Sequence, residues 1–282
     1  MHSFKIKHIL FLLISLWLFT GCLNDPSCDP VDETFFLDEY AQRDGVVKLP
    51  SGLMYKVLEA SEGEKPKFGS IVFVKYRGKL VTGQFFADTR EIDFFQLNEA
   101  TMPGILEALQ QMNEGSKFEF VIPPELGYAN DPPANSPVRC GSVLIFEMNL
   151  DSFLRDPDQF LAQNALRDDV NVTPSGLQYR VIENGEGDNA SFTDQVRIRY
   201  KGTFTNGYIF DQTEGTSSAS FPVGGVIPGF SEALQLMNRG AKLEIFIPPS
   251  LGYPRDPNPR TTLDAIISET VLVFEVELLN IL

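Results

Sequence analysis

The stretch VGGVIPGFSEALQLM, Val223 to Met237, predicts a short helix that begins at Pro228 and has one apolar face. Proline suits the first position of a helix, where its missing N–H costs no hydrogen bond. The i, i+3, i+4, i+7 spacing of a single buried stripe is met by Phe230, Ala233, Leu234 and Met237. A related stretch, NEATMPGILEALQQM, runs from Asn98 to Met112. The chain therefore contains this apolar helix twice.

The sequence around the helix is also repeated. PSGLMYKVLEASEGE from Pro50 matches PSGLQYRVIENGEGD from Pro174, and VFVKYRGKLVTGQFFADT from Val72 matches VRIRYKGTFTNGYIFDQT from Val196, both at an offset of 124 residues. Solenoid repeats are only about 20–50 residues long, so this period has the size of a domain. With 282 residues the chain is long enough for about two domains. We predict domain 1 at residues 32–150 and domain 2 at residues 151–282.

Each copy has the pattern of an antiparallel sheet. In VRIRYKGTF, residues 196–204, apolar and basic side chains alternate, which is typical of a strand buried on one side. Asn206-Gly207 is a residue pair of tight hairpin turns, and TVLVFEVELLNIL, residues 270–282, predicts a long last strand. Short helical segments precede the copies at Asp32–Val46 and Asp156–Val170. We predict an α+β fold in both domains, with a twisted antiparallel sheet wrapped on one short helix.

The first 22 residues have the pattern of a bacterial secretory signal. Lys5 and Lys7 precede the apolar run ILFLLISLWLF, which is too short for a membrane span of about 20 residues. The run ends in FTGC, which resembles a lipobox with Cys22 as the lipidation site, although Phe19 stands where leucine is usual. The alternative is an ordinary cleaved signal peptide. Residues 23–31 then predict a short polar tether.

Composition excludes several classes of function. The net charge of −15 becomes −17 once Lys5 and Lys7 are removed, and no basic cluster favours nucleic-acid binding. Both histidines lie within the first 22 residues, so the remaining chain lacks Ser–His–Asp chemistry and histidine-ligated metal sites. We expect no cofactor and no metal. Cys28 and Cys140 could pair or stay free in an oxidising envelope.

Five motifs in order carry a family resemblance. V-x-Y-x-G, G-x-x-F-D, VIPGF-x-x-x-L-x-x-M, IPP-x-x-x-Y and L-x-F-x-VEL resemble the FKBP-type peptidyl-prolyl cis–trans isomerases. FLAQNALRDDVNVTPSGLQYRVI, residues 160–182, resembles the lead-in of secreted, macrophage infectivity potentiator-like members. The resemblance implies a sheet curled around one helix, with a shallow apolar pocket for a prolyl ring. In domain 2 this pocket would be lined by Tyr200, Phe210, Asp211, Val226, Ile227, Phe230, Tyr253, Ile266 and Phe274.

Two positions of that pocket are open. Neighbouring Ile267 could replace Ile266, because AIISETV lacks the usual Ile-Pro-Pro. Ala219 aligns with an aromatic residue of many members, and Phe221 follows two residues later. The resemblance further implies that the Ile227 N–H and the Tyr253 hydroxyl bind the rotated carbonyl, while Asp211 organises the pocket. Rotation of an X–Pro amide requires neither proton abstraction nor a covalent intermediate, so the missing histidine is no obstacle.

The pocket of domain 1 is degenerate by the same comparison. Its counterparts are Tyr76, Phe86, Met102, Ile105, Tyr128, Val138 and Phe146. Ala87 stands where domain 2 has Asp211, and Asp88 could supply a carboxylate only through a one-residue shift. Ile105 stands where domain 2 has Phe230, the aromatic residue that would form the floor of the pocket under the prolyl ring. We therefore expect domain 1 to be a weak or inactive copy.

Two functions fit these observations. The first is a prolyl isomerase that assists protein folding in the cell envelope, anchored to the membrane through lipid on Cys22 and active mainly in domain 2. Its partners would be proline-containing segments of envelope proteins, with the outer membrane as the expected location. The alternative is a non-catalytic chaperone or assembly lipoprotein that uses both pockets for binding. The absence of tryptophan from both pockets favours this alternative.

Overall fold

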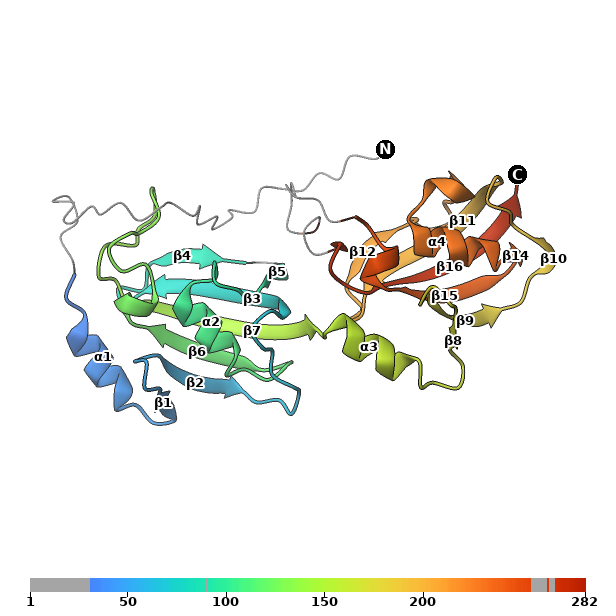
Figure 1. Ribbon diagram of the computed structural model, residues 1–282. Helices are drawn as coiled ribbons and strands as arrows, with labels where there is room; N and C mark the ends of the chain where they lie inside the picture. The colour runs from blue at the N-terminus through green and yellow to red at the C-terminus, as the bar shows by residue number, and fades with distance from the viewer. Residues whose placement is uncertain (1–30, 90, 255–262, 264–266) are drawn as a thin grey trace.

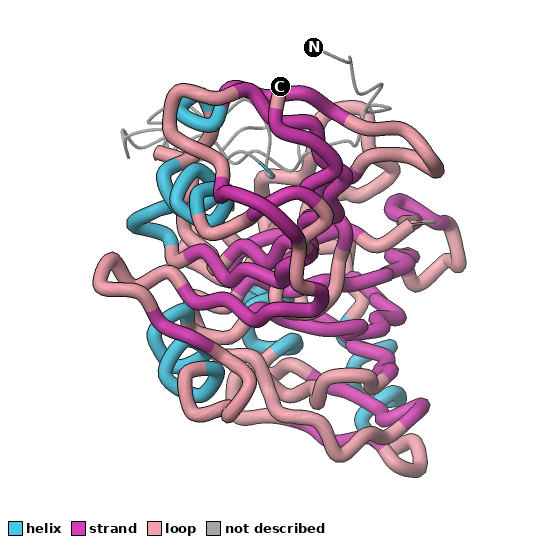
Figure 2. The backbone as a smooth tube through the Cα atoms, turned by 90° about the vertical axis from the view of Figure 1, so that its right-hand side faces the viewer, coloured by secondary structure: helices cyan, strands magenta, loops and turns pink. Residues whose placement is uncertain are grey.

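The computed structural model describes residues 31–89, 91–254, 263 and 267–282. These residues form two antiparallel sheets that lie next to each other, each with a short helix packed on it (Figures 1 and 2). The two-domain α+β prediction is therefore confirmed. The expected signal, the lipidation site Cys22 and all of the tether except Val31 lie outside the described residues. No helix in the described part of the chain is both long enough and apolar enough to cross a membrane.

The sheet of domain 1 has the strand order β1-β2-β6-β7-β3-β4, and β5 also pairs with β3. Its strands are β1 (Val46–Lys48), β2 (Met54–Glu59), β3 (Ile71–Leu80), β4 (Phe85–Asp88), β5 (Asp93–Gln96), β6 (Lys117–Ile122) and β7 (Leu144–Leu154). The helical elements are α1 (Thr34–Ala41), α2 (Pro103–Leu109) and the 3₁₀ turn η1 (Pro124–Leu126).

Domain 2 repeats this topology with the order β12-β11-β16-β15-β9-β8, and β13 also pairs with β11. The strands are β8 (Asn171–Val172), β9 (Gln178–Glu183), β11 (Gln195–Phe204), β12 (Ile209–Gln212), β13 (Ala219–Pro222), β15 (Lys242–Ile247) and β16 (Leu272–Ile281). A separate small ladder joins β10 (Glu186–Asn189) to β14 (Asn238–Arg239). The helical elements are α3 (Pro157–Asn164), η2 (Val223–Gly225), α4 (Pro228–Gln235) and η3 (Pro249–Leu251).

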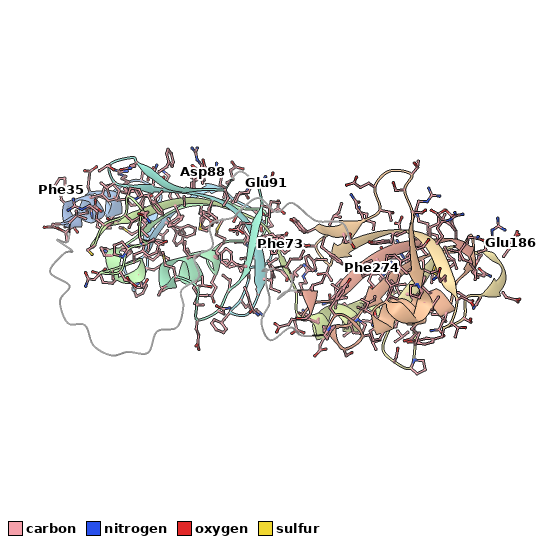
Figure 3. All side chains as sticks on the ribbon, turned by 90° about the horizontal axis from the view of Figure 1, so that it is seen from above. Phe35, Phe73, Asp88, Glu91, Glu186 and Phe274 are labelled. Carbon is pink, nitrogen blue, oxygen red and sulfur yellow. The ribbon has the colours of Figure 1, made fainter. Side chains whose placement is uncertain are left out.

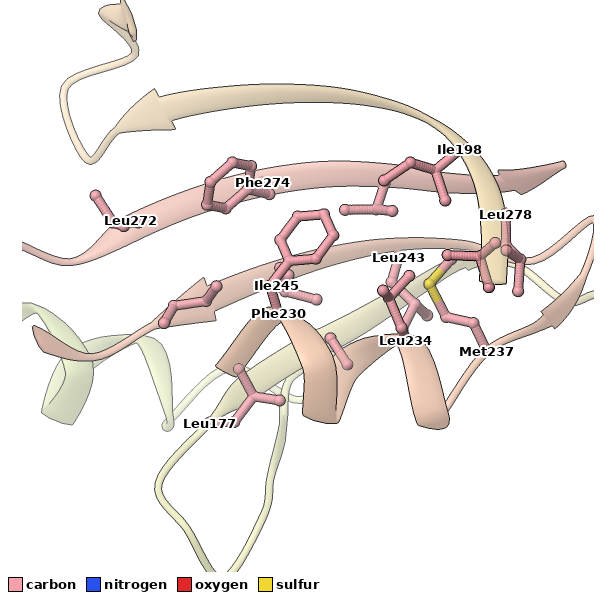
Figure 4. Packing of buried hydrophobic residues seen from close by; sticks show 14 of the residues in the cluster. Leu177, Ile198, Phe230, Leu234, Met237, Leu243, Ile245, Leu272, Phe274 and Leu278 are labelled. Atoms are coloured by element: carbon pink, nitrogen blue, oxygen red, sulfur yellow. The ribbon is translucent and has the colours of Figure 1, made fainter. Parts of the chain in front are cut away.

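Helix α4 packs its apolar stripe on the sheet, as the spacing predicts. Phe230 is 6% exposed, and the other three residues of the stripe are completely buried. Figure 4 shows the stripe beneath Ile245 of β15 and Phe274 of β16. Gly229 permits the close approach, because a Cβ there would lie 2.6 Å from a methyl group of Ile247. The sheet and helix therefore meet closely at the first turn of α4.

The two lead-in helices cover the opposite face of their sheets and are shorter than the predicted segments. In domain 1, Tyr40 of α1 is 2% exposed, and its hydroxyl donates a hydrogen bond to Glu119 at 2.8 Å. In domain 2, the ring of Phe160 on α3 lies 6.1 Å from that of Phe246. The Asp156 side chain caps α3 by accepting from the Gln159 N–H at 3.0 Å. Among the described residues, each sheet is thus covered by a lead-in helix on one face and by α2 or α4 on the other.

The domains share an aromatic contact. Phe73 of β3 lies 5.1 Å from Tyr208 and 6.1 Å from Phe204 between ring centres, and Phe94 of β5 lies 5.6 Å from Tyr208. Figure 3 shows Phe73 at the junction of the two domains. Phe73 is completely buried and belongs to the same apolar cluster as Phe274. The hairpin between β11 and β12 is therefore packed against domain 1.

Candidate functional site

The pocket of domain 2 has aromatic walls supplied by four elements. Phe274 of β16 meets Phe210 of β12 edge to face, with ring centres 5.4 Å apart and an interplanar angle of 87°. Phe230 of α4 lies 5.0 Å from Phe274 at 85°. The ring of Tyr200 on β11 stands 6.2 Å from Phe274 and 6.3 Å from Phe230. Edge-to-face aromatic contacts of this kind hold rings in fixed orientations. The four rings therefore form one packed aromatic cluster, which we call the aromatic box.

One carboxylate lies at the edge of this box. The Tyr200 hydroxyl donates a hydrogen bond to Asp211 Oδ2 at 2.7 Å. Burial, followed by the contact with Asp211, raises the pKa of Tyr200 above its ordinary value. The phenol is protonated at neutral pH, as an ordinary tyrosine is, and donates to the carboxylate. Asp211 lies opposite Gly202 across the β11–β12 ladder, and the absence of a side chain at Gly202 leaves room for the rings of Phe210 and Phe274.

Two further hydrogen-bond donors are available at the pocket. Ile227 immediately precedes α4, and its carbonyl accepts from the Ser231 N–H at 2.9 Å. Its own N–H has no acceptor among the described residues. Tyr253, just after η3, is 38% exposed, and burial followed by the charge of Asp211 raises its pKa. Its hydroxyl also has no hydrogen-bond partner within the described part of the chain. Both donors are free to bind a ligand.

The structure settles where most of the predicted residues of domain 2 lie. Val226 is partly buried against the core together with Ile227. Phe221, rather than Ala219, faces Tyr200, with ring centres 6.2 Å apart. Ile266 lies outside the described residues, while its alternative Ile267 packs against the core of domain 2. Apart from Ile266, the predicted apolar and aromatic residues other than Tyr253 thus lie in or against one apolar cluster, and Asp211 is bonded to Tyr200 of that cluster.

Domain 1 contains an aromatic arrangement of the same geometry. Phe86 and Phe146 meet edge to face at 5.4 Å and 90°, and Tyr76 lies 6.1 Å from Phe146. Ile105 forms the floor and is 8% exposed, while Val138 is 4% exposed. Met102 and Tyr128 complete the set as partly buried members of the same cluster. Burial raises the pKa of Tyr128 to about 12.

Sequence reasoning missed the carboxylate of the domain 1 pocket. Asp88 pairs with Arg77 at 3.5 Å, and both side chains are about half exposed. Figure 3 shows Asp88 at the periphery of domain 1. The Tyr76 hydroxyl instead donates to Asp93 Oδ2 of β5 at 3.2 Å. The signal for Asp93 was a lone acidic residue beside the apolar pair Phe94-Phe95, within a segment that reads as a strand.

The arrangement suits the binding of an apolar ring that carries a carbonyl next to it. Aromatic rings supply the flat apolar surface, and the free N–H and hydroxyl supply donors at its rim. No group of three or more His, Cys, Asp or Glu side chains among the described residues could hold a metal ion. A separate cavity of about 320 Å³ lies between the start of α1 and the η1 turn, away from both pockets.

A curved antiparallel sheet with an aromatic pocket above one short helix defines the class of protein, an α+β domain that occurs here in tandem. The model of the FKBP-type peptidyl-prolyl cis-trans isomerase domain matches residues 62–151 and again residues 187–279. The model of the domain amino-terminal to FKBP-type peptidyl-prolyl isomerases matches residues 149–181. The chain therefore belongs to the family of FKBP-type peptidyl-prolyl cis-trans isomerases, as its motifs indicated.

The curated relatives match this chain over about the length of one domain. The FKBP-type 22 kDa peptidyl-prolyl cis-trans isomerase of Escherichia coli is 46% identical over 125 residues, which cover 44% of this chain and 59% of the relative. The outer membrane protein MIP of Legionella longbeachae is 39% identical over 125 residues, or 44% and 52% of the two chains. The chain thus spans about half the length of the curated relatives it matches. The crystal structure of the three FKBP domains of wheat FKBP73 matches 83% of this chain and 96% of that one, with 21% identity and a TM-score of 0.37.

Proposed function

We propose that the chain is a peptidyl-prolyl cis–trans isomerase of the bacterial cell envelope, with its activity mainly in domain 2. The observation that carries the proposal is the hydrogen bond from Tyr200 to Asp211 at 2.7 Å, at the edge of a pocket lined by Phe210, Phe230 and Phe274. The substrates would be proline-containing segments of envelope proteins. The proposed domains are residues 32–150 and 151–282.

The proposed mechanism binds the twisted amide better than either planar form. Rotation about the peptide bond has a barrier of about 18–20 kcal/mol, because the planar amide is stabilised by resonance. An apolar pocket excludes water and disfavours the polar planar form. The Ile227 N–H and the Tyr253 hydroxyl would donate to the carbonyl in its rotated position. Such interactions accelerate the reaction only to the extent that they are stronger in the transition state than in the ground state.

In this mechanism Asp211 is an organising group rather than a base. It holds the Tyr200 ring through the hydrogen bond, and its charge adds to the burial that raises the pKa of Tyr253. Tyr253 is protonated at neutral pH, as an ordinary tyrosine is, and can donate to the substrate. No proton leaves the substrate in any step.

Three observations support the envelope location and the lipid anchor on Cys22. Residues 1–22 have the signal and lipobox pattern, and one relative is named an outer membrane protein. Cys140 is disulfide-bonded, and structural disulfides persist in oxidising compartments. Cys28, predicted from the sequence either to pair with Cys140 or to stay free, lies outside the described residues. Metabolic labelling with a fatty acid should mark the wild-type protein but not Cys22→Ala, and label on that variant would refute the anchor.

The second candidate function is a non-catalytic chaperone, and one observation favours it for domain 1. Its pocket floor is Ile105, which gives no flat aromatic surface under a prolyl ring. Suppression of client aggregation that survives Asp211→Ala would support this function. Loss of suppression together with catalysis would reject it.

The proposed activity is tested on the whole protein with a proline-isomerisation assay. Asp211→Ala and Tyr253→Phe should each lower kcat/KM by about tenfold, which corresponds to ~1.4 kcal/mol of transition-state stabilisation. Asp88→Ala is the matched control, since this exposed aspartate pairs with Arg77 away from the pocket. Wild-type activity no higher than that of both pocket variants would overturn the proposal. The domains are kept together because Phe73 of domain 1 is part of the apolar cluster of domain 2.

A further inference from the structure

The pocket carboxylate of domain 1 comes from a different strand than that of domain 2. In domain 2, Asp211 of β12 lies opposite Gly202 and accepts from Tyr200. In domain 1, the residue opposite the equivalent Gly78 is Ala87 of β4, which has no polar side chain. Tyr76 nevertheless donates to a carboxylate, that of Asp93 on β5, at 3.2 Å.

The strand registers show that the two residues have exchanged places. Asp93 of β5 pairs with Val74, and at the equivalent point of domain 2 Ala219 of β13 pairs with Ile198. In both domains the pocket tyrosine follows two residues later on the same strand, and so points to the same face of the sheet. Domain 1 therefore has Ala87 on β4 and Asp93 on β5. Domain 2 has the reverse, Asp211 on β12 and Ala219 on β13.

The other features of the domain 1 pocket, its aromatic walls and its hydrogen-bond donors, resemble those of domain 2. Its edge-to-face pair has the same 5.4 Å separation as the pair in domain 2. The residue before α2, Met102, has a carbonyl that accepts from Leu106 and an N–H with no acceptor among the described residues. Tyr128 lies close enough to Tyr76 to contribute, as a minor cause, to its raised pKa. An amide donor and a tyrosine thus accompany the carboxylate, as in domain 2.

Asp93 is partly buried, and burial disfavours the charged form of its carboxyl group. Burial is the largest influence on this carboxyl and raises its pKa, although the hydrogen bonds from the Phe94 N–H and from Tyr76 act the other way. Folding alone gains little from a carboxylate at such a position, because water or a neutral side chain could satisfy Tyr76. Groups whose pKa is shifted by burial beside a specific partner in a pocket are concentrated at functional sites.

We propose that domain 1 contains a second binding site for proline-containing peptides, in which Asp93 takes the place that Asp211 has in domain 2. This inference rests on the proposed function, because it assigns the same class of ligand to the second pocket. The floor of this site is aliphatic, since Ile105 replaces Phe230. The site therefore holds the prolyl ring without the aromatic surface beneath it, and Asp93 is a positioning residue that orients Tyr76.

The test follows the backbone amides of Met102 and Ile227 by NMR, because each reports on one pocket of the intact protein. The probe is a synthetic tetrapeptide with one Leu–Pro bond. Saturable shifts are expected at both amides. Asp93→Ala should weaken the apparent Kd at Met102 by at least fivefold and leave the Kd at Ile227 within twofold. Ala87→Asp/Asp93→Ala, which moves the carboxylate to the domain 2 arrangement, should restore binding at Met102.

The reciprocal exchange tests whether the two carboxylate positions are equivalent in catalysis. Asp211→Ala/Ala219→Asp moves the domain 2 carboxylate to the domain 1 arrangement and should recover at least a third of the activity that Asp211→Ala loses. Unchanged amide spectra of β7 and β16 would show that the variants are folded.

The NMR titration distinguishes failure of the second site from failure of the proposed function. Shifts at Ile227 without shifts at Met102 would overturn the second site and leave the proposed function intact. Binding at Met102 that is indifferent to Asp93→Ala and Asp93→Asn would reduce Asp93 to a structural role and overturn the inference. Absence of shifts at both amides would contradict the proposed function itself.

Discussion

The two pockets have the same walls and differ in their floor and in the source of their carboxylate. Both contain an edge-to-face aromatic pair at 5.4 Å and a tyrosine bonded to an aspartate. Phe230 provides an aromatic floor in domain 2, and Ile105 provides an aliphatic one in domain 1. Two copies of one domain can thus keep the same aromatic walls while the floor and the strand that supplies the carboxylate differ. Domain 1 keeps the aromatic walls, whereas its aliphatic floor offers no flat aromatic surface to a prolyl ring.

The largest difference in activity between the two domains is expected when the same aromatic wall is perturbed in each of them. A Cβ at Gly202 would lie 2.7 Å from the ring of Phe274, and a Cβ at Gly78 would lie 2.7 Å from that of Phe86. Overpacking of this kind costs about 1–3 kcal/mol of stability. Gly202→Ala and Gly78→Ala should therefore lower the free energy of unfolding equally, as measured with denaturant. Only Gly202→Ala should lower kcat/KM by more than about tenfold. Equal activity losses would show that both domains catalyse.

Exchanging the floor residues Phe230 and Ile105 tests whether the floor accounts for the difference between the domains. Phe230→Ile removes the edge-to-face contact with Phe274 and the contact with Tyr200. Aromatic pairs contribute about 0.5–1.5 kcal/mol beyond their buried area, so Phe230→Ile should lower the free energy of unfolding by about that amount. Loss of the flat surface under the prolyl ring should in addition lower kcat/KM by roughly three- to tenfold. Ile105→Phe should tighten peptide binding at the Met102 amide by a similar factor. A floor exchange that changes neither quantity would mean that the floor does not distinguish the domains.

The smallest expected effect concerns Asp93 and pH. Because burial raises its pKa, the folded state holds this proton more tightly than the unfolded chain. The stabilisation from the protonated form is present below the unfolded pKa of about 3.9 and is lost as pH rises through the folded pKa. Asp93→Asn should therefore raise the free energy of unfolding at pH 7 by less than about 1 kcal/mol. Denaturant titrations should show that this gain disappears near pH 3, and a gain independent of pH would contradict the explanation.

Local pattern was sufficient to predict helix α4 and the strands β11 and β16 of domain 2. The stripe from Phe230 to Met237 and the alternation in residues 196–204 are local signals, and both elements form as expected. The lead-in helices are shorter than predicted, because the apolar spacing continues past the point where the helical hydrogen bonding ends.

Long-range pairing explains what the sequence did not reveal. Asp93 reaches Tyr76 only because β5 pairs with β3, and the connection before β5 is two residues shorter than its counterpart before β13. Phe73 and Phe94 lie opposite each other on the outer face of domain 1, where domain 2 has Arg197 and Ser220. The presence of Phe73 and Phe94 at these two positions was the sequence signal of the contact between the domains. This signal could be interpreted only once the structure placed Tyr208 of domain 2 against both rings.

The most direct test of the central claim compares Tyr253→Phe with Tyr128→Phe in the intact protein. These residues occupy equivalent places after η3 and η1, and each substitution removes one hydroxyl without changing the ring. The account predicts that the exchange rate of a Leu–Pro peptide, followed by NMR, falls about tenfold in the Tyr253 variant and less than twofold in the Tyr128 variant. Equal losses, or a larger loss in the Tyr128 variant, would contradict the assignment of catalysis to domain 2.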